Sequence, residues 1–453
     1  MRKTVLATAV AAALALGAAN ASAAPTKGAA TKADMEAIQA QMQALADRLN
    51  KLEASNAELQ GENAELQALV ERRDAEVDYL KAQTKELREE GAVASNEISK
   101  VKGADWATKI KGRGDFRYRH ESIASERVVS GSAEDAADRN RHRIRARLGF
   151  DFKATDNVTG TLLLATGADD PRSSNQTLGG SGTRKSIGLD MAYVDWKFVQ
   201  GGNAVLGKQP IPIFRPGQAL FYDGDYNPEG AAVKFNRGMF FGTGYGWWVT
   251  ENYNADPSRN NTDTSIFGLQ GGIRFPFLNG ESVIAANYYE CVHCQDQSPL
   301  YANNGNGNTT YLSGTTNLLQ YGYEIFEVGA QMGTTVRDLP LTFWANYGQN
   351  MASDVEYDTA YAYGVMLGKA SNAKTWEAGV FYQSLDKDAL FAQWVDSDFG
   401  DGKTDSDGWV LKGGYAPVKN FTVNATYFMN TLNKDVGTEL DYDRLQLDLN
   451  YKF

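Results

Sequence analysis

Apolar and polar residues alternate with a period of two through most of residues 106–453. Because successive side chains of a strand point to opposite faces, this alternation predicts β-strands. Gly, Asn and Asp separate the alternating runs, as is typical of turns. We expect sixteen strands, at residues 106–120, 139–152, 157–167, 187–198, 203–209, 230–237, 239–250, 263–275, 281–292, 322–335, 340–350, 360–369, 374–385, 407–415, 420–430 and 441–453.

Short and long connections alternate between these strands. The turns ATDN, VQGG, FLNG and SNAK are short, whereas the connections that begin near Ala168, Pro210, Cys294 and Asp386 are longer and polar. An even number of strands with short turns at one end and long loops at the other is typical of a bacterial outer-membrane barrel, and a soluble sandwich has no reason to sort its loops in this way. The pattern therefore predicts an all-β transmembrane antiparallel β-barrel over residues 106–453.

Residues 35–90 follow a different period. Their apolar residues recur at spacings of three and four, which predicts a parallel α-helical coiled coil. Asn56 and Asn63 fall at successive core positions, where buried amides favour one register. A single amphipathic helix lying on a surface would show the same spacing and is the alternative. A short polar segment, 24–34, precedes this unit, and a small and polar linker, 91–105, follows it.

Residues 1–23 carry the pattern of a secretory signal peptide. Two basic residues precede the apolar run VLATAVAAALALG, and the small-x-small cleavage pattern Ala21-Ser22-Ala23 follows it. A membrane anchor is the alternative, but the apolar run is shorter than the ~20 residues that span a bilayer. The net charge of −11 argues against a nucleic-acid partner, because such proteins are usually basic.

The stretch RNRHRIRARLGFDF, residues 139–152, has arginine at every second position and apolar residues such as Leu148 and Phe152 between them. An arginine that faces lipid at the bilayer midplane costs about 2 to 4 kcal/mol, so the basic face must line the lumen. The first strand repeats the pattern. The sequence predicts a basic pore wall made of Lys109, Lys111, Arg113, Arg117, Arg119, Arg139, Arg141, Arg143, Arg145 and Arg147. The alternative is that these residues mainly neutralise lumen acids such as Asp115, Asp151 and Asp195.

The last strand, DYDRLQLDLNYKF, alternates throughout and ends on Phe453, which resembles the C-terminal assembly signal of outer-membrane proteins. Together with the signal peptide and sixteen strands it resembles the trimeric general porins, and the helical segment makes the chain similar to bacterial putative porins with a periplasmic stalk. The resemblance implies a homotrimer that contacts outer-membrane lipid and lipopolysaccharide, with the stalk in the periplasm. Leu and Val in the predicted seam lean toward two strands, which leaves a dimer open.

In general porins the loop after the fifth strand folds into the lumen and narrows it. The corresponding loop here is PIPIFRPGQALFYDGDYNPEG, 210–230, whose NPEG loosely matches the porin loop motif. The resemblance implies an acidic constriction formed by Asp223, Asp225 and Glu229 opposite the basic wall. Opposed charges would set up a transverse field that favours small polar or charged solutes. We therefore expect a water-filled channel for passive diffusion of small hydrophilic solutes and ions.

Cys291 and Cys294 are the only cysteines, and in an oxidising compartment a local disulfide is expected. A metal site would need further ligands, and haem attachment would need histidine where Gln295 stands. The acidic stretch VDSDFGDGKTDSDG, 395–408, fails the EF-hand pattern. We expect it to be an outer loop that is solvated or loosely binds divalent ions. No cofactor and no metal site are expected.

Catalysis is poorly supported, because the chain has three histidines and no serine in a nucleophile context, so we expect a protein that is not an enzyme. His120 and His142 both fall on the predicted outward face. The alternative function is a structural tether. In that case the coiled coil, with the lysine-bearing APTKGAATKAD ahead of it, would contact peptidoglycan and hold the outer membrane to the cell wall.

Overall fold

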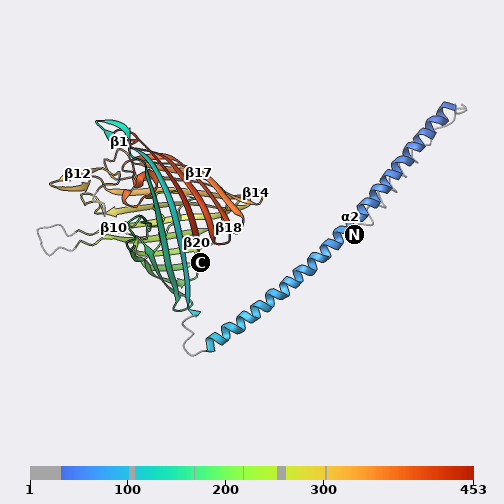
Figure 1. Cartoon of the computed structure of the whole chain (residues 1–453), viewed down its shortest axis with the longest axis horizontal. Helices are drawn as coiled ribbons and strands as arrows, with labels where there is room; N and C mark the ends of the chain where they lie inside the picture. The colour runs from blue at the N-terminus through green and yellow to red at the C-terminus, as the bar shows by residue number, and fades with distance from the viewer. Residues whose placement is uncertain (1–31, 101–107, 168, 218, 253–261, 301–303) are drawn as a thin grey trace. The chain divides into compact units, whose positions relative to one another are not determined.

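The computed structural model describes residues 32–100, 108–167, 169–217, 219–252, 262–300 and 304–453 (Figure 1). The chain divides into two units, Met1–Val101 and Lys102–Phe453. The expected signal peptide, residues 1–23, and most of the polar segment 24–34 lie outside the described residues.

The described part of the first unit is one helix, α2 (Lys32–Lys100), of 69 residues. A helix over 35–90 is therefore confirmed, while its association into a coiled coil stays a prediction. The helix continues beyond residue 90, where a linker was expected, because GAVASNEISK contains no proline and a single glycine to interrupt it. None of the described helices combines the length and apolarity needed to cross a membrane.

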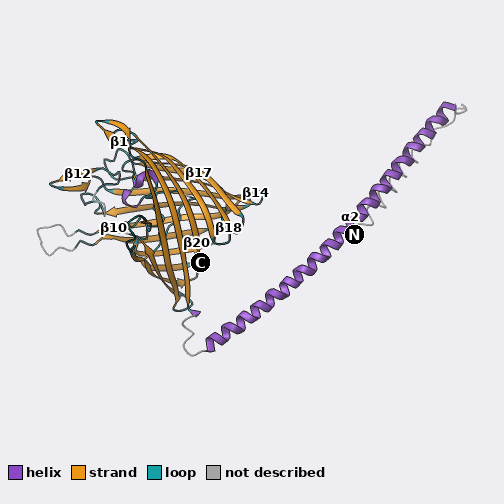
Figure 2. Ribbon diagram, in the orientation of Figure 1, coloured by secondary structure: helices purple, strands orange, loops and turns teal. Residues whose placement is uncertain are grey.

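The second unit is a closed antiparallel barrel (Figure 2). Its main sheet has 18 strands, of which β2 (Ser132–Asp135) and β5 (Gln176–Thr177) are short additions within loops, which leaves 18 − 2 = 16. The sixteen are β1 (Ile110–Val129), β3 (Arg139–Lys153), β4 (Val158–Thr166), β6 (Ile187–Val199), β7 (Gly202–Lys208), β8 (Glu229–Arg237), β9 (Phe240–Thr250), β10 (Thr264–Phe277), β11 (Gly280–Val292), β14 (Tyr323–Val336), β15 (Leu339–Asn350), β16 (Thr359–Gly368), β17 (Thr375–Leu385), β18 (Ser406–Val418), β19 (Phe421–Leu432) and β20 (Leu440–Lys452).

The barrel closes where the first strand pairs with the last. β1 and β20 are antiparallel from Asp115 opposite Lys452 to Ser125 opposite Tyr442. Closure leaves no strand edge unpaired, which is how barrels avoid edge-to-edge aggregation. The predicted sixteen-stranded antiparallel barrel is thus confirmed. A separate hairpin, β12 (Thr310–Ser313) and β13 (Thr316–Leu319), lies within the connection from β11 to β14.

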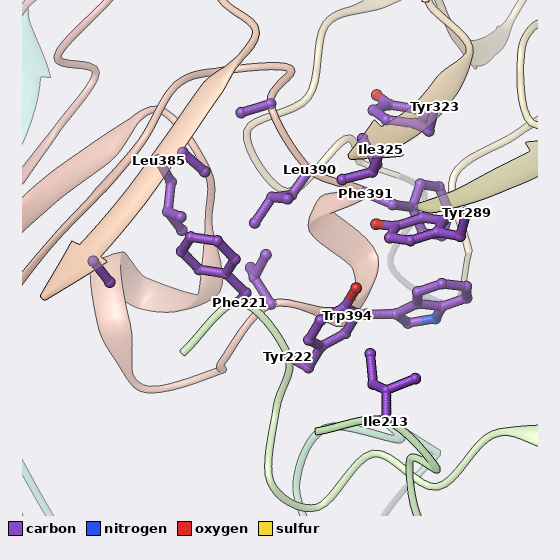
Figure 3. Close-up of a cluster of buried hydrophobic side chains, with 14 of the residues drawn as sticks. Ile213, Phe221, Tyr222, Tyr289, Tyr323, Ile325, Leu385, Leu390, Phe391 and Trp394 are labelled. Atoms are coloured by element: carbon purple, nitrogen blue, oxygen red, sulfur yellow. The ribbon is translucent and has the colours of Figure 1, made fainter. Parts of the chain in front are cut away.

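Two connections fold into the barrel and bury an apolar core there (Figure 3). They are loop 209–228, between β7 and β8, and loop 386–405, between β17 and β18, which contains the short helices η1 (Ala392–Trp394) and η2 (Phe399–Gly402). Trp394 packs against Trp247 of β9, with ring centroids 5.6 Å apart, and stacks on Tyr226 at 5.1 Å. The core therefore lies inside the barrel, against strands from β8 to β19.

The expectation that the acidic stretch 395–408 is a solvated outer loop is wrong. Asp405 is 3% exposed, and the residues before it, Leu390, Phe391 and Trp394, are almost fully buried. These apolar side chains carry the loop inward, because their burial against the aromatic barrel interior is favourable by roughly 1.5 to 3 kcal/mol each. The acidic stretch follows them into the lumen. Within the described part of the chain, no group of three or more His, Cys, Asp or Glu is arranged to hold a metal ion.

Candidate functional site

A cavity of about 410 Å³ lies inside the barrel, between the two inward loops and the strands on the opposite side of the lumen. β1, β3 and β17 to β20 supply the strand side of its lining. Six basic and six acidic residues line it: Arg117, Arg119, Arg145, Arg147, Arg172 and Lys412, and Asp223, Asp225, Glu377, Asp396, Asp398 and Asp448. Charges of both signs therefore meet in one polar space.

The basic side of the cavity comes from the alternation in β1 and β3. The register places Arg117 opposite Arg145 and Arg119 opposite Arg143 across the two strands. Like charges directly opposite one another destabilise a sheet, so this wall needs carboxylates close by. Of the ten predicted basic residues, four line the cavity: Arg117, Arg119, Arg145 and Arg147.

The other predicted basic residues lie away from the cavity. Arg141 and Arg143 pair with the fully buried Glu121, and Arg113 pairs with Asp151, with Nε 3.4 Å from Oδ2. Lys109, Lys111 and Arg139 are exposed at the ends of their strands and are not among the residues that line it.

Asp115 and Asp225 neutralise the part of the wall formed by Arg145 and Arg147. Asp115 lies 2.9 Å from Arg145 and 2.7 Å from Arg147, and Asp225 of loop 209–228 approaches the same two arginines at 3.3 and 3.6 Å. Burial by itself would raise the pKa of the Asp225 carboxyl, but Arg145 and Arg117, with hydrogen bonds from Ser174, outweigh it and hold this pKa below its usual range. Asp225 is thus an ionised group placed directly against the basic wall.

Arg119 and Arg444 form a second cluster with Asp398 of loop 386–405. Arg119 binds Asp448 through two nitrogens, at 2.7 and 2.8 Å, and Asp398 at 2.9 Å. Arg444 lies 2.7 Å from Asp398 and 2.8 Å from Glu121. Burial would raise the pKa of Asp398, yet the guanidiniums of Arg444 and Arg119 hold it well below its usual range.

Two neighbouring loop carboxyls behave in the opposite way. Burial, reinforced by the nearby Asp398, raises the pKa of Asp396 to about 6. Burial, together with the charges of Asp396 and Asp225, raises the pKa of Asp223 well above its usual range. The acidic side of the cavity thus contains carboxyls that stay ionised and carboxyls that are held close to protonation.

Arg117 differs from the other cavity-lining arginines. It donates to Asn175 Oδ1 at 2.6 Å, and among the described residues no carboxylate forms an ion pair with it. Its Nε is buried without a hydrogen-bond partner in the described structure. One guanidinium therefore faces the cavity without a carboxylate in direct contact, although the charges of Asp225 and Asp448 lie near enough to act on it.

Glu229 does not belong to the acidic side of the cavity, contrary to expectation. The chain has already entered β8 at this residue, where it lies opposite Lys208 across the β7–β8 ladder, and the two side chains pair at 3.1 Å. Asp223 and Asp225, by contrast, both line the cavity. Cys291 and Cys294 form a disulfide at the end of β11, away from the cavity.

The alternative in which arginines neutralise lumen acids describes part of the wall. Asp115 pairs with Arg145 and Arg147, and Asp151 pairs with Arg113. Asp195 does not take part, because it accepts hydrogen bonds from Asn203 at 3.0 and 3.1 Å. The basic wall is therefore extensively neutralised rather than uniformly positive.

Sequence reasoning missed several residues of the site. Arg444 and Asp448 lie on the polar face of the last strand, whose alternation was visible, but their partners depend on barrel closure. Asp396 and Asp398 lie in a stretch that was assigned to the outside. The apolar run ALFAQWV, which leads into this stretch, indicates an inward loop, because large apolar side chains in a solvated loop would be exposed to water.

A closed barrel of sixteen antiparallel strands with a charged lumen is the architecture of porins, whose barrels are wide enough to hold an aqueous channel. The family model described as "Putative porin" matches residues 124–354 and 341–453. These matches cover well over half of the chain. The chain belongs to this family.

Several solved porins are similar to this chain at low sequence identity. OprB of Pseudomonas putida at high pH is 14% identical, with a TM-score of 0.50, over 77% of this chain and 95% of that one. The loop L8 deletion mutant of OmpT, an outer-membrane protein of Vibrio cholerae, is 12% identical over 76% and 99%, with a TM-score of 0.45. OmpF of Salmonella typhi in complex with daunomycin is 15% identical over 76% and 97%, with a TM-score of 0.44. No curated protein matches the chain at a significant level of sequence similarity.

Proposed function

We propose that this protein is an outer-membrane porin through which small hydrophilic solutes and ions diffuse passively. The observation that carries the proposal is the charged cavity, because a barrel that only served as an anchor would have no need of a polar space lined by twelve ionisable residues. Membership of the porin family favours a channel over an enzyme.

The outward surface of the barrel supports a membrane location. Phe116, Leu148, Phe152, Leu447 and Leu449, on β1, β3 and β20, are each about two-fifths exposed in the single chain. Each alternates with the charged residues that point inward. Apolar side chains of this kind are favourable against acyl chains, whereas arginines there would cost about 2 to 4 kcal/mol each near the midplane.

The two sides of the cavity define how the channel would select solutes. Arg117, Arg145 and Arg147 stand on one side, and the two inward loops supply the ionised Asp225 and Asp398, with Asp396 adding its charge above about pH 6. Opposed charges in a low-dielectric wall create a field across the passage, which favours small polar or charged solutes over apolar ones. The lining carries equal numbers of basic and acidic residues, so we expect only a modest preference between anions and cations.

Single-channel recording from the purified full-length protein in planar bilayers tests the proposal. We expect stepwise conductance in KCl and a permeability to uncharged sugars that falls with sugar size. Protein that is folded by circular dichroism and reconstituted in the bilayer, yet produces no conductance, would contradict a porin function.

We further propose a homotrimer. Tyr118 and His142 face outward and hydrogen-bond at 2.9 Å, and the rings of His142 and His120 lie 4.8 Å apart. Polar rings in contact with acyl chains are costly, so this patch is better covered by another subunit than by lipid. Cross-linking of the purified protein followed by mass measurement distinguishes three copies from two or one.

The helix α2 suggests a second candidate function. Its seam residues, including Met42, Leu45, Leu49, Leu52 and Leu59, are more than half exposed in the single chain. A parallel coiled coil in the periplasm would bury them, and such a stalk would also suit a tether that reaches peptidoglycan. Deletion of residues 33–90 distinguishes the porin function from the tether function. A porin still conducts without these residues, whereas loss of a tether gives cells with blebbing envelopes.

A further inference from the structure

We propose that loop 386–405 is a second constriction element of the channel, and that Asp398 in this loop determines how strongly the pore prefers anions. The inference rests on the proposed porin function. Asp398 does this by balancing part of the positive charge of Arg119 and Arg444, which would otherwise be in excess over their remaining partners Asp448 and Glu121 and would attract small anions such as phosphate or carboxylates.

Three other loops fix loop 386–405 in the lumen. Arg172 of the loop between β4 and β6 donates to the carbonyl oxygens of Ala392 at 3.3 Å and Gly402 at 2.9 Å. Asn308, from the loop between β11 and β14, donates to Leu390 O at 2.9 Å and accepts from Ala392 N at 2.9 Å. The loop is therefore built into the lumen from two sides.

The third set of contacts joins the two inward loops to each other. Asp223 N donates to Trp394 O at 2.7 Å, and Ser397 N donates to the Asp223 carboxylate at 2.8 Å. Asp396 N donates to Leu220 O at 3.2 Å. Since Asp223, Asp396, Ser397 and Asp398 also line the cavity, the passage is bounded by both loops together.

The formal charge of the ion-pair cluster around Asp398 explains the importance of this residue. The ion pairs link four arginines, Arg119, Arg141, Arg143 and Arg444, with three carboxylates, Glu121, Asp398 and Asp448. This cluster has a formal charge of 4 − 3 = +1. Loss of the Asp398 charge leaves 4 − 2 = +2, whereas the neighbouring cluster of Arg145 and Arg147 with Asp115 and Asp225 stays at 2 − 2 = 0.

The position of Asp398 makes that charge accessible to ions. Its two carboxylate oxygens face Arg119 on β1 and Arg444 on β20, at 2.9 and 2.7 Å, and its side chain is 19% exposed. Arg119 and Asp398 both line the cavity. The excess positive charge left there is desolvated and close to the path of a permeating ion, so it acts more strongly than it would in bulk water.

The test is the substitution Asp398→Asn in the full chain, recorded in a KCl gradient. We expect the reversal potential to move toward anion selectivity, with a several-fold rise in the chloride-to-potassium permeability ratio. Inorganic phosphate should also block the chloride current of this variant more strongly than that of the wild type. The matched control is Asp401→Asn, which removes one charge from the same loop at a half-exposed residue paired with Lys403. Equal reversal potentials for the two variants, or no shift for Asp398→Asn, would overturn the inference.

A second measurement keeps the inference testable if Asn at this position disturbs folding. The two native cysteines are joined in a disulfide, so a new cysteine can be labelled selectively. With Ser397→Cys, a charged methanethiosulfonate reagent should reduce the single-channel current, and with Asp401→Cys it should not. An unchanged current for labelled Ser397→Cys would show that the loop does not border the passage. A wild-type protein without conductance would instead refute the porin function itself.

Discussion

The two sides of the barrel share one strand pattern and differ in what faces inward. On β1, β3 and β20 the inward residues are mostly charged, as with Arg119, Arg145 and Asp448. On β9 to β15 they are mostly uncharged, and aromatic or apolar residues such as Trp247, Tyr289 and Ile325 are almost fully buried. The outward residues are mostly apolar on both sides, apart from the patch of Tyr118, His120 and His142. The inward residues alone therefore decide whether a sector of the lumen is filled or open.

The physical reason lies in the cost of covering each wall. Apolar loop residues such as Phe391 and Trp394 gain free energy when they pack on the aromatic side, roughly 25 cal/mol for each Å² of apolar surface removed from water. Packing the same residues against the arginines would strip water from charged groups without offering them partners. The apolar parts of the loops consequently gather on one side, and only their acidic residues, such as Asp225 and Asp398, reach the charged wall beside the passage.

The largest effect should come from removing the central ring of the apolar side. Trp394→Ala deletes a side chain that is 1% exposed and packs on Trp247, Tyr226 and Phe391. We expect a loss of about 3 to 5 kcal/mol in the free energy of unfolding, and a higher single-channel conductance as loop 386–405 loosens. Denaturant unfolding measures the loss of stability, and bilayer recording measures the conductance. Trp248→Ala is the control: Trp248 follows Trp247 in β9 but points outward, so its removal should leave the conductance unchanged.

A smaller effect is expected from reversing one charge on the other side. Arg145→Glu places a carboxylate beside Asp115 and Asp225, which lie 2.9 and 3.3 Å from the native guanidinium. We expect the reversal potential in a KCl gradient to move toward cations, with the global fold retained. Arg139→Glu is the control, because Arg139 is exposed and lies outside the cavity. If both variants matched the wild type, the charged side would not border the passage.

A change of pH should shift selectivity more modestly. The pKa of Asp396 is raised to about 6 by burial and by Asp398, so this carboxyl is ionised above that pH and neutral below it. As the pH falls through 6, the acidic side loses negative charge and the channel should prefer anions more strongly. Reversal potentials measured at a series of pH values test this, and Asp396→Asn should weaken the dependence. A wild-type reversal potential that ignores pH in this range would contradict it.

The smallest effect should follow loss of the disulfide. Cys291 and Cys294 lie at the end of β11, outside the cavity, and close a loop of only a few residues. Because the stabilisation from a cross-link grows with loop length, Cys291→Ala with Cys294→Ala should cost about 2 kcal/mol or less. Conductance and selectivity should equal those of the wild type. A change in selectivity would mean that the loop after β11 affects the charged side.

Periodicity predicted the strands and the inward face of the arginines, because both depend only on local alternation. It did not predict the filled half of the lumen. Adjacent apolar pairs such as Ile266-Phe267 and Ile325-Phe326 show strands that are apolar on both faces, a signal that the barrel interior is packed there. The partners in the charged half depend on closure, since Arg119 and Asp448 are 329 residues apart. Alternation within one strand carries no information about such pairs.

The seam between β1 and β20 has a consequence for biogenesis. The first strand to be synthesised acquires one of its two neighbours only when the last strand arrives, and with it come Arg444 and Asp448, which bind Glu121 and Arg119. A product that lacks β20 would expose two unpaired edges and leave those buried charges without their counterparts. Such a fragment cannot close into a stable barrel. Only a chain with all sixteen strands therefore reaches the folded state.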